Sequence, residues 1–291
     1  MSEGSRPAPI FREPRSDGES RSSALVQPPA ANLAEFTVLR VVEARRLTPH
    51  MRRVTFSGSN LHAFDTTEHL HVGLLLPPPG ASRDGWLRLL GNGRASVRDA
   101  GCKPVNRKYT IRAIDPAAGL IDIDFVLHED GGPGGAWAES AEAGDLLGVL
   151  GPGGRGLAAA DWYLIAGDET ALPAIGRMME TMPDTAKGYV IVEIADRAEQ
   201  QPLRMPPGMS FRWLHRDGAP AGTTGLLLEA IRSAPVPPDG SRPFVWVGAE
   251  FAAAQAIREH LCRHAGISRA DQLVVGYWRL GRSDAAEDGN S

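Results

Sequence analysis

The chain has 291 residues, of which 42% are hydrophobic and 23% charged, as expected for a globular protein long enough for two domains. Its formal net charge is −4, with 31 basic and 35 acidic residues, so no overall positive field favours a nucleic-acid partner. Its two cysteines, Cys102 and Cys262, are too few for an iron–sulfur cluster or a cysteine-rich zinc site, and we expect no metal site.

The first 33 residues carry charges and prolines but lack the apolar core of a signal peptide, so we expect a disordered tail there. A second short tail is expected at 283–291. No run of the sequence approaches the roughly 18 consecutive apolar residues of a spanning helix. These features favour a cytoplasmic protein, by default a monomer, without a membrane or nucleic-acid partner.

Short strand-like segments with frequent turns fill the first half of the chain, and little of it has helical spacing. This pattern predicts a small antiparallel barrel. Asp115-Pro116 separates two of the segments, as the turn of a hairpin would. The expected strands lie at 36–42, 51–56, 70–76, 109–114, 120–127 and 145–150.

After Asp161 strands alternate with helices, which predicts a parallel sheet covered on both faces. The glycine- and proline-rich tract at 151–156 marks the boundary between the two halves. The expected strands lie at 162–166, 189–194, 210–214, 244–247 and 272–275, and the expected helices at 173–181, 226–231 and 252–265.

The run Arg107-Lys108-Tyr109-Thr110-Ile111-Arg112 places a cation, an aromatic ring and a hydroxyl close together on one expected strand. Because side chains alternate along a strand, Arg107 and Tyr109 should share one face and Thr110 should lie on the other. A ring beside a guanidinium suits a planar, phosphorylated cofactor. Ordinary strand surface, with a packed tyrosine and a solvated arginine, remains an alternative for this run taken alone.

Three further segments could carry chemistry. His128 precedes a glycine-rich turn that leads into a short helix, and such a turn offers backbone N–H groups to a pyrophosphate, or is simply a flexible hairpin loop. Asp168, Glu169 and Thr170 follow the first strand of the second half, where parallel sheets bind dinucleotides, although a capped helix start explains them nearly as well. Gly276-Tyr277-Trp278-Arg279 ends the last strand and could line a pocket or pack a domain interface.

In this order along the chain, the segments resemble the siderophore-interacting protein family, whose members are flavin-dependent ferric-siderophore reductases related to ferredoxin reductases. The resemblance runs from about Phe36 to Arg282. It includes the segment from Arg45 to Phe56, the Arg107–Arg112 run, the glycine-rich turn with Trp137 and Ala138, Gly-Asp-Glu-Thr-Ala-Leu-Pro from Gly167, and the final Tyr-Trp-Arg. It implies a six-stranded antiparallel Greek-key barrel that binds FAD at 34–156, then a Rossmann-like parallel sheet with flanking helices that binds NAD(P)H at 157–282.

The resemblance also implies roles for individual residues. Arg107 would hold a flavin phosphate, Tyr109 would stack on the flavin ring, and Thr110 would hydrogen-bond near its reactive nitrogen. Asp168, Glu169 and Thr170 would lie where nicotinamide meets flavin, and Trp278 would be a further cofactor-binding residue. The rest of FAD, including its pyrophosphate, would be held by His128, Gly132, Pro133, Gly135, Trp137 and Ala138. Electron transfer needs no protein acid or base, so we predict no catalytic residue.

The sequence departs from the family pattern at two places. Tyr-Trp-Arg-Leu-Gly stands where Tyr-Trp-Arg-Arg-Gly is usual, and Val247-Gly248-Ala249-Glu250 stands where Ala-Gly-Glu is more usual. The whole chain contains only three lysines, so arginines would have to bind an anionic ferric chelate.

The implied function is electron transfer from NADPH or NADH through FAD to a ferric siderophore, with release of Fe²⁺. Arg197, Arg212 and Arg216 could bind the 2′-phosphate of NADPH, whereas Glu193 and Asp196 could accept the ribose hydroxyls of NADH. Two alternatives remain open at this level: a reductase that passes electrons to a protein such as a ferredoxin, and a module that binds flavin or siderophore without catalysis.

Overall fold

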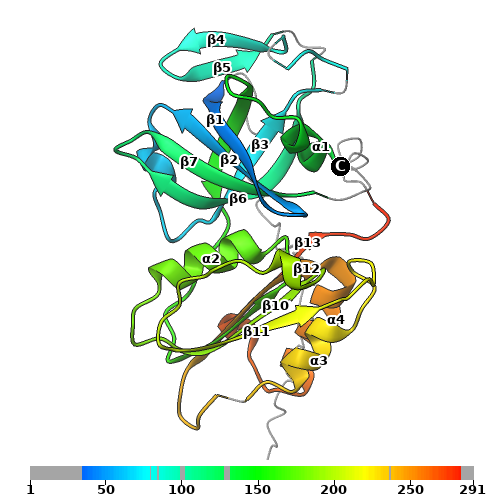
Figure 1. Ribbon diagram of the computed structural model, residues 1–291. Coiled ribbons are helices and arrows are strands. Elements are labelled where there is room, and N and C mark those ends of the chain that lie inside the picture. The colour runs from blue at the N-terminus through cyan, green and yellow to red at the C-terminus, as the bar shows by residue number, and fades with distance from the viewer. Residues whose placement is uncertain are drawn as a thin grey trace, which may run out of the picture. The chain divides into compact units, whose positions relative to one another are not determined.

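The computed structural model describes residues 35–78, 80–83, 85–98, 102–127, 132–235 and 237–282. The tails expected at 1–33 and 283–291 lie outside the described residues. Figure 1 shows an antiparallel barrel in the first half of the described chain and a parallel sheet with helices in the second half.

Six strands close the barrel in the order β1–β2–β7–β6–β3–β8, with β8 pairing back onto β1. Strand β2 pairs with β7 rather than with β3, which gives the Greek-key order. The predicted six-stranded antiparallel barrel is therefore confirmed. Its strands are β1 (Phe36–Thr48), β2 (Met51–Gly58), β3 (His71–Leu76), β6 (Val105–Asp115), β7 (Leu120–Val126) and β8 (Leu146–Gly153).

Strand β7 shows why the barrel closes in this register. Ile121, Ile123 and Phe125 point into the core and are almost fully buried, while the aspartates between them lie on the other face. Arg53 on β2 donates to both oxygens of Asp124, through Nε at 2.6 Å and Nη2 at 2.8 Å. A slip of one residue would expose the core face and break this ion pair.

A two-stranded hairpin, which the sequence analysis did not predict, extends the barrel sheet beyond β1. It consists of β4 (Leu87–Gly91) and β5 (Arg94–Val97), and β5 pairs with β1 at only Phe36 and Thr37. Its two strands are short, and in β4 the alternation of Leu87, Arg88 and Leu89 stops at Leu90, which follows a second leucine directly. The pattern therefore gave no strand signal.

The second half contains a five-stranded parallel sheet in the order β11–β10–β9–β12–β13. The central strand β9 is buried along its whole length, as expected for a strand covered on both faces. This confirms the Rossmann-like sheet. Its strands are β9 (Trp162–Gly167), β10 (Lys187–Ile194), β11 (Gly208–His215), β12 (Pro243–Glu250) and β13 (Gln272–Trp278).

Helices cover both faces of this sheet. Ile165 packs with helix α2 on one face, and Leu164 and Ala166 pack with α3 and α4 on the other. None of the described helices is both long and apolar enough to cross a membrane. The helices are α1 (Pro133–Glu139), α2 (Leu172–Thr181), α3 (Leu226–Arg232), α4 (Phe251–Arg263) and the 3₁₀ turns η1 (Leu61–Phe64), η2 (Arg197–Glu199) and η3 (Arg269–Asp271).

We predict that Gly188→Ala strongly destabilises the parallel sheet. Gly188 has a φ of 143°, and a Cβ there would lie 1.9 Å from the carbonyl oxygen of Tyr163 on the neighbouring strand. The free energy of unfolding in urea should fall by about 3 kcal/mol or more, because neither backbone can move without breaking the ladder. The matched control is Gly153→Ala, where nothing lies within 4 Å of the added carbon. Equal unfolding midpoints for the two variants would refute this explanation.

Candidate functional site

Strand β6 presents the predicted motif on two opposite faces. The ring of Tyr109 packs against Phe125 of the barrel core, with centroids 4.5 Å apart. Thr110 is buried on the other face and lies opposite His71 of strand β3 in the ladder. The predicted alternation of Tyr109 and Thr110 is confirmed.

Tyr109 lies against the start of helix α1. A Cβ built on Gly134 would lie only 1.8 Å from the Tyr109 hydroxyl oxygen, so the close approach depends on glycine. Burial raises the pKa of the Tyr109 phenol, despite the lowering influence of the nearby Arg107 cation. The phenol is therefore neutral at physiological pH.

Arg107 lies on the same side of β6 and is only partly engaged. Its Nη1 donates to the carbonyl of Asn106 at 2.7 Å, but its buried Nη2 has no hydrogen-bond partner among the described residues. A buried cationic donor without an acceptor is costly unless a ligand supplies one. An anionic oxygen is the acceptor that this position fits best.

Helix α1 begins next to these residues, at Pro133, with Gly132 as its N-cap. No side chain caps its first turn, and nothing lies within 4 Å of a Cβ built on Gly132. Gly135 packs closely on the end of β7, where its added Cβ would lie 3.0 Å from the carbonyl of Val126. Gly132, Pro133 and Gly135 thus flank Gly134, the residue that approaches Tyr109. No described atom occupies the space next to the Gly132 backbone where a side chain would begin.

Trp137 and Ala138 point elsewhere. Trp137 stacks on Phe56 in the barrel core at 6.1 Å between centroids, and Ala138 is fully buried in the same core. Their side chains fix α1 to the barrel, although the buried Nε1 of Trp137 has no partner among the described residues. His128 lies outside the described residues.

The Thr110 face of β6 meets the last strand of the parallel sheet. Burial raises the pKa of Tyr277 on β13, and the neighbouring Thr110 hydroxyl lowers it by a smaller amount. The Tyr277 hydroxyl makes no hydrogen bond of regular geometry within the described chain, although Thr110 is close enough to influence it. The Tyr277 ring also meets His71 edge-on, with centroids 6.2 Å apart. The sequence offered Tyr277 only as part of the Gly276–Arg279 segment, for pocket lining or interface packing, and it did not point to His71. Strand pairing and packing across the two halves bring these two residues together.

Asp168 joins the carboxyl ends of three neighbouring strands. Its Oδ1 accepts from the backbone N–H of Thr170 at 2.9 Å and from that residue's hydroxyl at 2.5 Å. Its Oδ2 accepts from the N–H of Glu250 at 3.0 Å and from Nε1 of Trp278 at 2.9 Å. The structure thus brings together three predicted cofactor-binding residues, Asp168, Thr170 and Trp278, of which the sequence grouped only the first two, at the point where the sheet order reverses.

Burial is the main cause that raises the pKa of Asp168, from 3.8 to about 6, and the negative charge of Glu169 adds to it. The hydrogen bonds from Thr170 and Trp278 act in the opposite direction. The Asp168 carboxyl consequently titrates close to physiological pH.

Glu169 has a different partner. Both guanidinium Nη groups of Arg216 donate to its carboxylate, at 2.8 and 2.6 Å, and a carboxylate oxygen of Glu193 lies 3.6 Å from Nη1 of Arg216. Glu193 itself accepts from Thr224 and from the N–H of Leu227. Arg216 and Glu193, two of the residues that sequence reasoning offered for nucleotide contacts, are therefore engaged within the protein.

Comparison with known proteins agrees with this geometry. A family model described as "Siderophore-interacting FAD-binding domain" matches residues 40–156, and one described as "Siderophore-interacting protein" matches residues 160–281. The chain is 34% identical to the ferric vibriobactin reductase ViuB of Vibrio cholerae over 86% of its own length and 91% of that protein.

The chain belongs to the siderophore-interacting protein family. A siderophore utilization protein from T. fusca has a similar solved structure, with 40% identity, a TM-score of 0.72, and coverage of 86% of this chain and 95% of that one. The siderophore-interacting protein SipS from Aeromonas hydrophila gives 32% identity, a TM-score of 0.73, and coverage of 86% and 94%.

The barrel of this siderophore-interacting protein is an FAD-binding domain, and its described residues fit that cofactor. The unpartnered Nη2 of Arg107 can donate to a phosphate, and the Gly132 side of α1 leaves room for one. Tyr109 supplies an aromatic ring beside them. Which atoms of FAD each residue contacts stays a prediction.

We predict that ionisation of Asp168 destabilises the folded protein. Because its pKa is higher when folded, about 6 against 3.8, the stabilising contribution of the protonated form is complete below pH 3.8 and is lost as the pH rises through about 6. The change should amount to roughly 2–3 kcal/mol. It is measured as the difference in free energy of unfolding between wild type and Asp168→Asn across this pH range.

The exposed substitution Asp239→Asn is the matched control, since it removes a carboxylate without touching the buried cluster. A wild-type minus Asp168→Asn difference that stays constant with pH would show that Asp168 does not titrate in this window.

Proposed function

We propose that the chain is an NAD(P)H-dependent ferric-siderophore reductase of the cytoplasm that releases Fe²⁺ for iron assimilation. The observation that carries the proposal is the meeting of Thr110, on the strand of the FAD-binding barrel, with Tyr277, on the last strand of the parallel sheet. A donor bound at the sheet edge would thereby lie next to a flavin bound at β6. The similarity to a ferric vibriobactin reductase over most of both chains supports the same reaction.

The chain's own residues would bind and orient the flavin. Arg107 would donate to a phosphate of FAD, and backbone N–H groups in the first turn of α1 would donate to the pyrophosphate. Tyr109 would pack on the ring system. Thr110 would offer its buried hydroxyl near the reactive edge of the ring. When bound, FAD supplies the conversion between a two-electron donor and one-electron acceptors.

The nucleotide would bind across the carboxyl edge of the parallel sheet. Trp278 and the buried Asp168 would form the wall beside the nicotinamide, with Glu169 and Thr170 fixing the turn that holds it. Arg216 is engaged by Glu169, so Arg197 and Arg212, which are both exposed, would have to bind a 2′-phosphate. We favour NADPH as the donor because these two exposed cations could bind its 2′-phosphate.

The iron chelate would be held by cations rather than by a metal site of the protein. Among the described residues no group of three or more histidine, cysteine or carboxylate side chains is arranged to bind a metal ion. Hard oxygen donors bind Fe²⁺ less tightly than Fe³⁺, so a one-electron reduction would release the iron without a protein acid or base.

The test measures Fe²⁺ release from a ferric siderophore by the purified, FAD-reconstituted chain, with a coloured ferrous chelator as the trap. NADPH and NADH are compared in parallel, and omission of FAD or of the chain gives the background. Release that depends on both FAD and the chain supports the proposal. Electron delivery to a ferredoxin but not to ferric siderophores, or FAD binding without any electron delivery, would contradict it.

We also predict that Gly134→Ala weakens FAD binding by displacing the Tyr109 ring. The added Cβ would lie 1.8 Å from the Tyr109 hydroxyl, and the ring is the part that must move. The dissociation constant for FAD should rise about tenfold or more, which corresponds to about 1.4 kcal/mol. The matched control is Gly153→Ala on strand β8, whose Cβ meets nothing within 4 Å and which is not among the predicted FAD-binding residues. Isothermal titration of FAD into both variants checks the prediction, and equal affinities would remove Tyr109 from the flavin site.

A further inference from the structure

The β4–β5 hairpin combines exposed leucines with arginines on a chain whose net charge is negative. Leu89 is 57% exposed and Leu90 is 43% exposed, and they are neighbours on β4 just before the turn. Figure 1 shows the hairpin projecting from the barrel strands. The two exposed leucines lie on opposite faces of β4, so the end of the projecting hairpin carries an apolar side chain on each side, which is unfavourable in water.

The hairpin itself carries charge of one sign. Residues 87–97 contain two arginines, Arg88 and Arg94, and no aspartate or glutamate; Arg98 follows directly, and Asp84 and Asp99 flank this stretch in the sequence. Arg94 pairs with Glu35 at 3.1 Å on the surface. No carboxylate of a described residue lies within ion-pair distance of Arg88 or Arg98.

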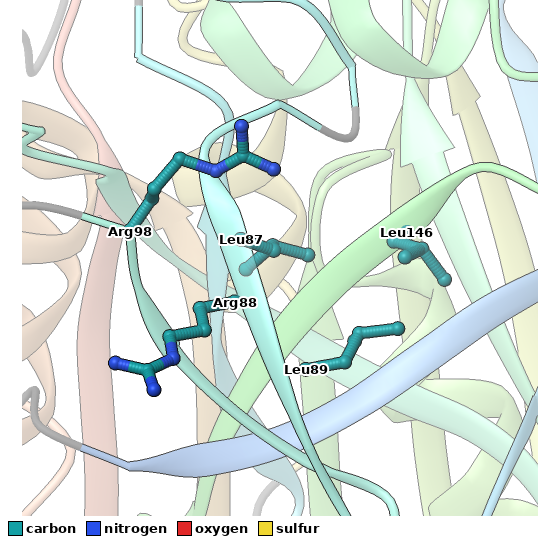
Figure 2. Close-up of a pocket in the computed structure, with 5 residues that line it drawn as sticks. All are labelled: Leu87, Arg88, Leu89, Arg98 and Leu146. Carbon is teal, nitrogen blue, oxygen red and sulfur yellow. The ribbon is translucent and has the colours of Figure 1, made fainter.

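Leucine and arginine side chains line one hollow at the hairpin. It encloses about 450 Å³ and is lined by Leu87, Leu89 and Leu146 together with Arg88 and Arg98. Figure 2 shows Leu87 and Leu89 directed toward Leu146, whereas the guanidinium group of Arg88 extends away from the three leucines. The surface therefore has an apolar part and a cationic part side by side.

We propose that the β4–β5 hairpin docks the protein reversibly on the surface of an anionic phospholipid bilayer. Leu89 and Leu90 would enter the region between headgroups and acyl chains, and Arg88 and Arg98 would contact lipid phosphates. The charge complementarity selects this occupant, because an apolar partner without negative charge would leave the arginines unused. The expectation of a protein without a membrane partner rested on the lack of a spanning segment, which excludes a span and not a surface contact.

Docking through the hairpin leaves the FAD site accessible. The hairpin continues the sheet from β1, whereas Arg107, Tyr109 and Thr110 lie on β6, three strands further round the barrel. The proposal does not rest on the proposed reductase activity, and its test needs neither FAD nor nucleotide.

The experiment is co-sedimentation of the full chain with vesicles of phosphatidylcholine alone and with vesicles rich in phosphatidylglycerol. We expect binding to the anionic vesicles only, and we expect it to weaken as salt is added, because exposed charges are screened. Leu89→Ser with Leu90→Ser should lower the partition coefficient about tenfold. Arg88→Gln with Arg98→Gln should lower it about 25-fold, since each basic residue near an anionic surface contributes about fivefold.

Val42→Ser is the matched control. Val42 is 47% exposed, a value between those of Leu90 and Leu89, but it lies on β1 outside the hairpin. Its binding should equal that of the wild type, and thermal unfolding shows that each variant is folded. Failure to bind anionic vesicles, equal binding to both vesicle types, or equal binding by the leucine variant and the wild type would overturn the proposal. So would a dimer in vesicle-free buffer that the leucine substitutions abolish, which would assign the surface to a second copy.

Discussion

The alternation of side chains along strand β6 sets the position of the other groups at the site. Tyr109 points toward helix α1 and the barrel core, with Arg107 on the same side of the strand, while Thr110 points toward the last strand of the parallel sheet. Because a strand allows no other arrangement for adjacent residues, one strand serves two surfaces at once. The barrel closes around the first surface, and the parallel sheet meets the second.

A second constraint lies at the carboxyl edge of the parallel sheet, where the buried charges are held by one another. Asp168 accepts hydrogen bonds that originate after β9, at the end of β12 and on β13. Glu169 is neutralised by Arg216, so the turn carries its carboxylates into the interior with every oxygen occupied. A buried pair of this kind is weak evidence for added stability, but the paired oxygens tie the turn to Arg216, Glu250 and Trp278. The nucleotide would therefore meet a surface that is already in place.

Much of this architecture was predictable from the sequence, because it depends on local patterns. The two-residue alternation gave the six barrel strands, and the change to strand–helix alternation after Asp161 gave the parallel sheet. The hairpin β4–β5 was missed, since its leucines and arginines follow no clean alternation. The extension of β1 to Thr48 was missed as well, because pairing with β2 and not local preference maintains it.

The site was predictable only in its separate pieces. The sequence placed Asp168 after a buried strand and Trp278 at the end of another, but only the sheet order shows that they share a hydrogen bond. Arg216 was a candidate for a nucleotide phosphate until the structure placed it on Glu169, 47 residues away in the chain. Contacts of this kind depend on tertiary packing, which one sequence does not encode in any local pattern.

The most direct test of the central claim, that nicotinamide and flavin sites meet where β6 faces β13, is anaerobic mixing of the FAD-reconstituted chain with NADPH in a stopped-flow spectrophotometer. The visible flavin absorbance should bleach rapidly in the wild type. In Tyr277→Ala, which alters the contact with Thr110 on the sheet side alone, the bleaching rate should change while FAD affinity stays the same. A wild type that binds FAD but does not bleach with either NADPH or NADH would contradict the claim.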